Sequence, residues 1–244
     1  MVNGEWWSAA PSLVHLFTRS PHRAPVHLLT LSSQGSDNGP MSTSCSPVHA
    51  QACLILQAYL SQRFPEEGAR LQALQAQLQD PEGDAFNRAQ MRGHITTSAI
   101  VLDPATRQLL LIHHKTLQRW LQPGGHFEPN EAADPLLASA LREAREETGV
   151  QALQPHPEYV DAGSGLALPL DIDSHAIPAN PRKQEGAHWH HDYAYLLLAD
   201  SRAPLRPQLA EVHAAAWQPV RAWAEAPDLR FQTVARKLAA LGLA

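Results

Sequence analysis

The segment from Asp134 to Gly149 constrains the fold of this chain more than any other stretch. Asp134 is a good N-cap because its carboxylate can accept a hydrogen bond from an orphan backbone amide, and Pro135 suits the first helical position. Gly149 can adopt the left-handed conformation that often ends a helix. The segment therefore predicts a helix with defined ends, whose apolar face must pack against a core.

Two neighbouring stripes run along this predicted helix. Apolar residues at helical spacing indicate the buried face, namely Leu137, Ala140, Leu141 and Ala144. Beside them lie three carboxylates at i, i+3 and i+4, which share one side of a helix: Glu143, Glu146 and Glu147. Because like charges at this spacing repel, the cluster favours a bound cation, and oxygen ligands suit Mg²⁺ or Mn²⁺. A solvated, charged helix surface is the alternative that this pattern alone leaves open.

Glycines that precede the helix favour a bound cation over a solvated, charged helix surface. With them the chain resembles the Nudix family, whose signature is Gly, five residues, Glu, seven residues, then Arg-Glu-aliphatic-x-Glu-Glu-x-Gly-aliphatic. The matching positions here are Gly125, Glu131, Arg142, Glu143, Ala144, Glu146, Glu147, Gly149 and Val150. Gly124 and Gly125 let the backbone pass close to a metal ion or a phosphate, which a side chain would obstruct.

One departure from the signature concerns its first glutamate. Ten residues, instead of seven, separate Glu131 from Arg142. If the spacing of seven is enforced, the position falls on Asp134, which is also the predicted helix cap, and both assignments stay open. The resemblance implies that this position supports the loop and the helix. The second half of the signature, from Arg142 to Val150, matches without a gap, so the insertion does not affect its carboxylates.

The resemblance implies an α+β fold, an α/β/α sandwich with a mixed β-sheet, for residues 93–244. Strands are expected at Ile95–Leu102 and Gln108–His113 ahead of the signature, and at Tyr193–Ala199 behind it, from their apolar and partly β-branched composition. The spacing of apolar residues from Phe231 to Leu241 predicts a closing amphipathic helix that packs on the core.

A helical pair is expected in residues 41–92, since apolar residues recur at helical intervals over Val48–Phe64 and Pro65–Leu78. We interpret the pair as a packing cap on the main domain, with a substrate lid or a homodimer contact as alternatives. Residues 1–40 show no periodicity and are expected to be a disordered upstream extension, with Met41 as an alternative start.

Histidines are dense in the second half of the chain, with five of them from His175 to His213. Because alternate residues of a strand share one side, His188 and His190 can lie together and bind a metal ion or a phosphate. His175 and Asp192 are candidate partners. The alternative is a solvated loop, since the cluster lacks a fixed zinc spacing. The chain is similar to a Nudix branch with a preceding helical pair and a His-rich insert.

The activity implied by the resemblance is metal-dependent hydrolysis of a diphosphate linkage in a nucleoside diphosphate derivative or a related small metabolite. The expected catalytic residues are Arg142, Glu143, Glu146 and Glu147, and the three glutamates are the expected ligands of Mg²⁺ or Mn²⁺. Substrate contacts are expected from Gly124, Gly125, His126, His188 and His190. Glu211 is a further candidate, either as a distant metal ligand or as the base.

Composition limits the other functions open to the chain. The 19 basic and 24 acidic residues give a net charge of −5, which argues against a general binder of nucleic acid or membrane surfaces. No apolar run approaches the roughly 20 residues that span a bilayer. Cys45 and Cys53 are too few for a disulfide scaffold, which fits a cytoplasmic protein. Both precede the predicted sheet, which disfavours an isoprenoid-type isomerase with a catalytic cysteine. A non-catalytic module that senses a nucleotide or metabolite is the main alternative.

Overall fold

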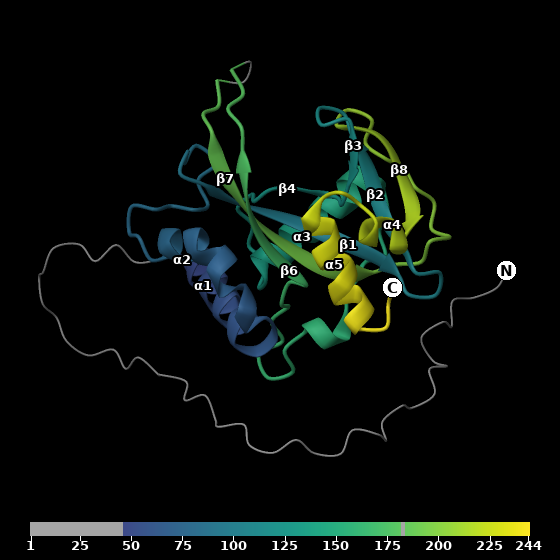
Figure 1. Cartoon of the computed structure of the whole chain (residues 1–244), viewed down its shortest axis with the longest axis horizontal. Coiled ribbons are helices and arrows are strands. Elements are labelled where there is room, and N and C mark those ends of the chain that lie inside the picture. The colour runs from purple at the N-terminus through teal and green to yellow at the C-terminus, as the bar shows by residue number, and fades with distance from the viewer. Residues whose placement is uncertain (1–45, 182–183) are drawn as a thin grey trace, which may run out of the picture. The chain divides into compact units, whose positions relative to one another are not determined.

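The computed structural model describes residues 46–181 and 184–244 of the chain. The extension predicted for residues 1–40, together with Met41 and Cys45, lies outside the described residues. Within the described part, the chain forms one mixed sheet with helices on both of its faces (Figure 1).

Eight strands make up this sheet in the described residues. They are β1 (His94–Asp103), β2 (Gln108–His114), β3 (Arg119–Leu121), β4 (Gly124–His126), β5 (Gln154–Pro155), β6 (Asp171–Ile177), β7 (His188–Leu198) and β8 (Val212–Pro219). The main path runs β3-β2-β1-β7-β5, while β4, β6 and β8 pair with β1, β7 and β2. β1 and β7 run parallel and the other pairs run antiparallel. The predicted mixed sheet and its first two strands are confirmed.

Helices and short helical segments precede, separate and follow the strands along the chain. They are α1 (Pro47–Ala58), the π-turn η1 (Tyr59–Arg63), the 3₁₀ segments η2 (Pro65–Leu71) and η3 (Pro157–Tyr159), α2 (Gln72–Leu78), α3 (Pro135–Thr148), α4 (Arg221–Ala224) and α5 (Leu229–Ala240). The break between η1 and η2 falls at Phe64, which leaves the helical region ahead of Pro65. None of the described helices is long and apolar enough to cross a membrane.

The two faces of the sheet can be read from β1. Thr97 Oγ1 donates a 2.9 Å hydrogen bond to Ser139 Oγ of α3, whereas Ser98 Oγ donates to Asp192 Oδ2 of β7. Because successive side chains of a strand point to opposite faces, α3 covers one face and Asp192 lies on the other. On that second face, Arg230 of α5 lies 3.9 Å from Asp173 of β6. The sheet therefore lies between α3 and α5, which confirms the predicted sandwich.

A buried ionic network joins the helical pair to the rest of the fold. Lys237 Nζ of α5 lies 2.6 Å from both Tyr59 Oη and Asp171 Oδ1, and 2.9 Å from Glu67 Oε1. Arg70 Nη2 lies 2.7 Å from Asp171 Oδ1. Apolar residues of α1 and α2 also belong to the same core as those of the sheet. These contacts favour the packing-cap interpretation, while the lid and the homodimer contact stay predictions.

Candidate functional site

Helix α3 begins and ends where the sequence predicts. Asp134 Oδ1 accepts a 3.2 Å hydrogen bond from the backbone N–H of Leu137, and Gly149 adopts a left-handed φ of 80°. Glu143 and Glu147 are only 8% and 4% exposed, whereas Glu146 is solvent-exposed. Two of the three clustered carboxylates therefore lie inside the protein, which a purely solvated helix surface would not produce.

The glycine turn packs directly against these buried carboxylates. The backbone N–H of Gly124 donates a 2.9 Å hydrogen bond to Glu147 Oε2. A Cβ atom at Gly125 would lie 2.6 Å from Glu143 Cδ, and a Cβ atom at Gly124 would lie 2.6 Å from Ser98 Cβ. Only glycine fits at either position without displacing its neighbour.

Arg142 holds the exposed and buried parts of the cluster together. Its Nη2 donates to Glu143 Oε1 at 2.8 Å, and its Nη1 donates to Glu146 Oε2 at 2.9 Å. Nη2 also lies 3.4 Å from the carbonyl oxygen of His126, at the end of the glycine turn. The guanidinium group therefore orients two carboxylates and links α3 to β4.

Burial of Glu143 and Glu147 disfavours the charged forms of their carboxylates. Burial raises the pKa of Glu147 to about 8, and the charges of Glu143, Glu211 and Glu146 add to this, although the Gly124 N–H opposes it. Burial also raises the pKa of Glu143, against the effect of Arg142. A divalent cation would compensate these charges, and hard carboxylate oxygens are the donors that Mg²⁺ and Mn²⁺ prefer. The donor set therefore fits such an ion.

One open cleft of about 1710 Å³ collects most of the predicted site residues. Those that line it are Gly124, Gly125, His126, Arg142, Glu143, Glu146, Glu147, His188, His190 and Glu211. The cleft lies on the sheet face that bears Asp192 and Asp173, and both of these residues line it as well. Its volume exceeds the roughly 300–1,000 Å³ of a usual small-molecule pocket, so a nucleotide-sized ligand would fill only part of it.

Glu131 and Asp134 are not among the described residues that line the cleft. Glu131 is exposed. Asp134 accepts from Leu137 through Oδ1 and from the backbone N–H of Ala167 through Oδ2, at 3.2 Å. Asp134 therefore supports both the helix and the loop beyond it, while its assignment to the signature position, like that of Glu131, stays a prediction.

The His-rich segment corrects one expectation. β7 begins at His188, five residues ahead of the predicted Tyr193, so this segment is strand and the solvated-loop alternative is wrong. Pairing with β1 and β6 on its two sides overrides the low strand propensity of the sequence. His188 Nε2 lies 3.2 Å from His190 Nε2. Burial, with nearby imidazoles led by His126, lowers the pKa of His190 to about 2, so that it stays neutral.

Several residues of the cleft were not predicted. Asp192 was predicted as a partner of the histidines, and it also accepts hydrogen bonds from two residues of β1 that were not predicted, through Thr96 Oγ1 and Ser98 Oγ. His94 lies against His190 with 4.8 Å between ring centroids. The first turn of α5, including Arg230, also lines the cleft. Its apolar spacing indicated only packing, so no local signal pointed to this role.

The fold and the site together define a sandwich domain in which a glycine turn and a carboxylate-bearing helix meet at one cleft. A family model described as NUDIX domain matches residues 92–240, and the chain belongs to this family. The structure is similar to the crystal structure of a NUDIX-family hydrolase from Clostridium perfringens, with a TM-score of 0.44 and 23% sequence identity. The similarity covers 61% of this chain and 97% of that one.

Two curated relatives are similar to the chain. A Bos taurus protein named m7GpppN-mRNA hydrolase NUDT17 is 29% identical over 205 residues, which are 75% of this chain and 61% of that protein. A protein of Lactococcus lactis subsp. cremoris named probable DHNTP pyrophosphohydrolase is 31% identical over 119 residues, which are 48% of this chain and 63% of that protein. The matches thus span less than two thirds of either relative.

Proposed function

We propose that this chain is a metal-dependent pyrophosphohydrolase that cleaves a diphosphate linkage in a nucleoside diphosphate derivative or a related metabolite. Family membership supports this activity, and so do the relatives, one named an mRNA hydrolase and the other a probable pyrophosphohydrolase. The observation that carries the proposal is the contact of two buried carboxylates, Glu143 and Glu147, with the Gly124-Gly125 turn.

Nudix hydrolases generally need a divalent metal ion, and the proposed ion here is Mg²⁺ or Mn²⁺. Glu143, Glu146 and Glu147 would hold it, with Arg142 fixing the first two carboxylates. When bound, such an ion neutralises charge on phosphate oxygens and favours attack by water at phosphorus. The protein contributes the preset positions of these carboxylates.

Proton removal from the attacking water is assigned to a carboxylate of the same site. Glu147 is buried and oriented by the Gly124 N–H. Glu211, at the start of β8, lies close enough for its charge to raise the pKa of Glu147. Both carboxylates are proposed as acceptors of this proton. Substitution of each residue, with kcat and metal affinity measured separately, distinguishes the base from a metal ligand. His126, His188 and His190 line the cleft and are proposed substrate contacts.

An isoprenoid-type isomerase finds no support in this geometry. Cys53 lies on α1 and lines a different cavity, between α1 and α2. In the described residues, the lining of the main cleft includes no cysteine. The described residues of this site therefore lack the thiol on which that chemistry relies.

A panel of nucleoside triphosphates, nucleotide sugars, dinucleotides, capped dinucleotides and inositol phosphates, assayed with Mg²⁺ and with Mn²⁺, tests the proposal. Phosphate and pyrophosphate are measured separately, and ¹⁸O-labelled water shows which phosphorus is attacked. We expect turnover that requires metal and that Glu147→Gln removes, while Glu225→Gln, at an exposed site outside the cleft, leaves it unchanged. Saturable binding of a panel compound with no turnover would instead establish the sensing module.

A further inference from the structure

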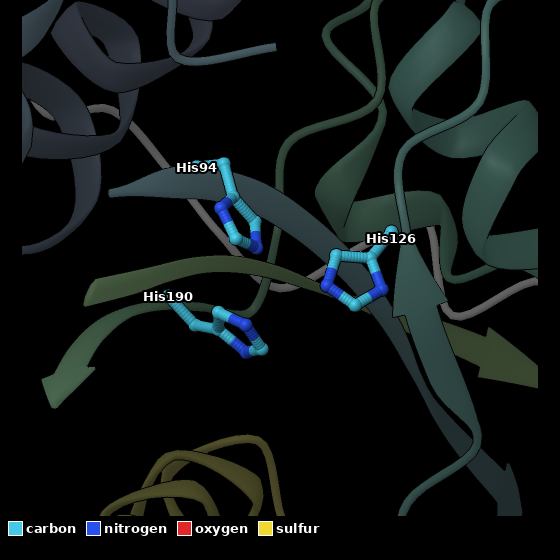
Figure 2. Close-up of side chains that lie close together, drawn as sticks. All are labelled: His94, His126 and His190. Carbon is cyan, nitrogen blue, oxygen red and sulfur yellow. The ribbon is translucent and has the colours of Figure 1, made fainter. Parts of the chain in front are cut away.

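A cluster of imidazoles lies beside the carboxylate site, at the end of the glycine turn. Ligand nitrogens of His94, His126 and His190 all lie within 4.8 Å of one another. Their ring centroids are 5.0 Å apart for His94 and His126, 4.8 Å for His94 and His190, and 5.2 Å for His126 and His190. Figure 2 shows the three rings projecting from three strands toward a common space. Such a set matches three protein ligands of a transition-metal site.

Sheet register explains why these histidines meet. His94 is the register partner of His190 in the parallel β1–β7 pair, so both side chains lie on the same face. In the antiparallel β1–β4 pair, His126 lies opposite Thr96, two residues along β1 on that same face. The cluster thus depends on three strands, each part of the sheet, rather than on a flexible loop. Backbone hydrogen bonding preorganises it.

His94 shows a buried nitrogen that lacks a hydrogen-bond partner in the described structure. Its side chain is 2% exposed, and Nδ1 lies 3.4 Å from the carbonyl oxygen of Gln90. Because a carbonyl only accepts, Nδ1 carries the proton and Nε2 presents its lone pair. Nε2 is buried without a partner among the described residues. An unsatisfied buried acceptor costs free energy, which a bound metal ion would offset.

His188 repeats this arrangement next to the trio. Its Nδ1 lies 2.8 Å from the carbonyl oxygen of Gly186, so its Nε2 also presents a lone pair. That Nε2 lies 3.2 Å from His190 Nε2. His188 is not one of the three clustered ligands, so this contact orients His190 instead of binding the ion. A ring N–H donated to a backbone carbonyl is also the usual second contact of a metal-bound histidine.

We propose that His94, His126 and His190 bind one divalent transition-metal ion of the Zn²⁺ type, at a site distinct from the carboxylate site. Imidazole nitrogens favour zinc and its neighbours, whereas the carboxylates of α3 favour Mg²⁺ or Mn²⁺. The ion cross-links β4, which carries the glycine turn, to β1 and β7. It thereby stiffens the turn whose Gly124 N–H orients Glu147. This site goes beyond the proposed hydrolysis.

Metal binding to the full chain, stripped with a chelator and then desalted, tests this site without any assay of turnover. We expect one Zn²⁺ per chain by calorimetry, and visible d–d absorption of tetrahedral type when Co²⁺ is used as the probe. His94→Ala and His190→Ala should each weaken Zn²⁺ binding by at least about 100-fold. His213→Ala is the matched control, because His213 also lies on a strand beside another imidazole, His113, at 5.4 Å between centroids.

Two further variants keep the outcome decisive. His126 is only half-buried, so His126→Ala should stay folded, as circular dichroism will show, and should still lose the Co²⁺ spectrum. The double variant Glu143→Gln, Glu147→Gln should retain Zn²⁺, which separates this site from the carboxylate site. Failure of the folded wild-type chain to bind Zn²⁺ or Co²⁺ overturns the proposal. So does binding that survives His126→Ala, or binding that the glutamine substitutions remove.

Discussion

The backbone N–H of Gly124 donates a 2.9 Å hydrogen bond to the buried carboxylate of Glu147. This bond joins β4 to α3, so the two halves of the family signature meet as one structural unit. This close approach requires glycine, because a Cβ at Gly125 would overlap Glu143. Orientation of the carboxylates is therefore built into the fold before any ion or substrate binds.

Glu147→Gln should lower kcat by roughly 10²–10⁴-fold, because an amide can neither ligate a hard cation as well nor accept a proton. The folded state should not suffer. Burial raises the pKa of Glu147 to about 8, so at neutral pH the metal-free fold must bind a proton that the unfolded chain does not, and this lowers its stability. In chelator, the melting temperature of the variant should equal or exceed that of the wild type.

Calorimetry with and without Mg²⁺ checks both parts of this expectation. Mg²⁺ should raise the melting temperature of the wild type by mass action and should have less effect on the variant. Glu225→Gln is the control in both buffers. Near-normal turnover by Glu147→Gln would remove this residue from the site, whatever happens to its stability.

Gly125→Ala should damage the site while Gly68→Ala does not. The new Cβ at Gly125 would lie 2.6 Å from Glu143 Cδ, so either the turn or the carboxylate must move. We expect a loss of stability of about 1–3 kcal/mol and a larger fall in kcat than in substrate affinity. At Gly68 a Cβ meets nothing within 4 Å. Equal kinetics for the two variants would show that the turn accommodates a Cβ at Gly125 without harm to the site.

Local signals were enough to predict α3, and they could not predict the histidine cluster. The ends of the helix depend on consecutive residues, since Asp134 caps it and Gly149 takes a left-handed φ of 80°. The cluster depends instead on the register of β1 with β7 and of β1 with β4, which no local pattern encodes. His190 was predicted as a site residue, but its register partner His94 was not.

The cleft shows the same division between local and non-local information. The clustered carboxylates Glu143, Glu146 and Glu147 come from one helix and could be located by motif and spacing. Arg230 of α5 lines it because the helix packs across the second face of the sheet, which amphipathic spacing alone does not reveal. Substrate preference depends on such residues, so it was the least predictable property of the chain.

Asp134→Ala should lower the stability of the fold, whereas Glu131→Ala should leave it almost unchanged. Asp134 accepts two backbone hydrogen bonds, from Leu137 and from Ala167, so its loss should cost about 0.5–2 kcal/mol. For a chain of this size that is a fall of roughly 1–8 °C in melting temperature. Glu131 is exposed, and its substitution should stay within about 0.5 kcal/mol. Thermal unfolding of both variants checks this, and the reverse order would assign the supporting position to Glu131.

Glu67 should make stability depend on acid pH through the network around Lys237. Burial alone would raise the pKa of Glu67, but hydrogen bonds from Tyr59 and Lys237, with the charges of Lys237 and Arg70, outweigh it and lower that pKa overall. A lowered pKa in the folded state means that the ionised carboxylate stabilises the fold above the unfolded pKa of about 4.3. This contribution is lost as the pH falls through the lower, folded-state pKa.

Glu67→Gln should therefore lower the melting temperature at pH 7 and approach the wild type in acid. We expect a cost of roughly 1–3 kcal/mol at pH 7, the usual size for a hydrogen bond to a charged group, and a shrinking difference below about pH 4.3. Glu82→Gln, at an exposed turn, is the control and should track the wild type throughout. A difference between Glu67→Gln and wild type that stays constant from pH 7 to about pH 3 would show that the carboxylate contributes through packing and not through its charge.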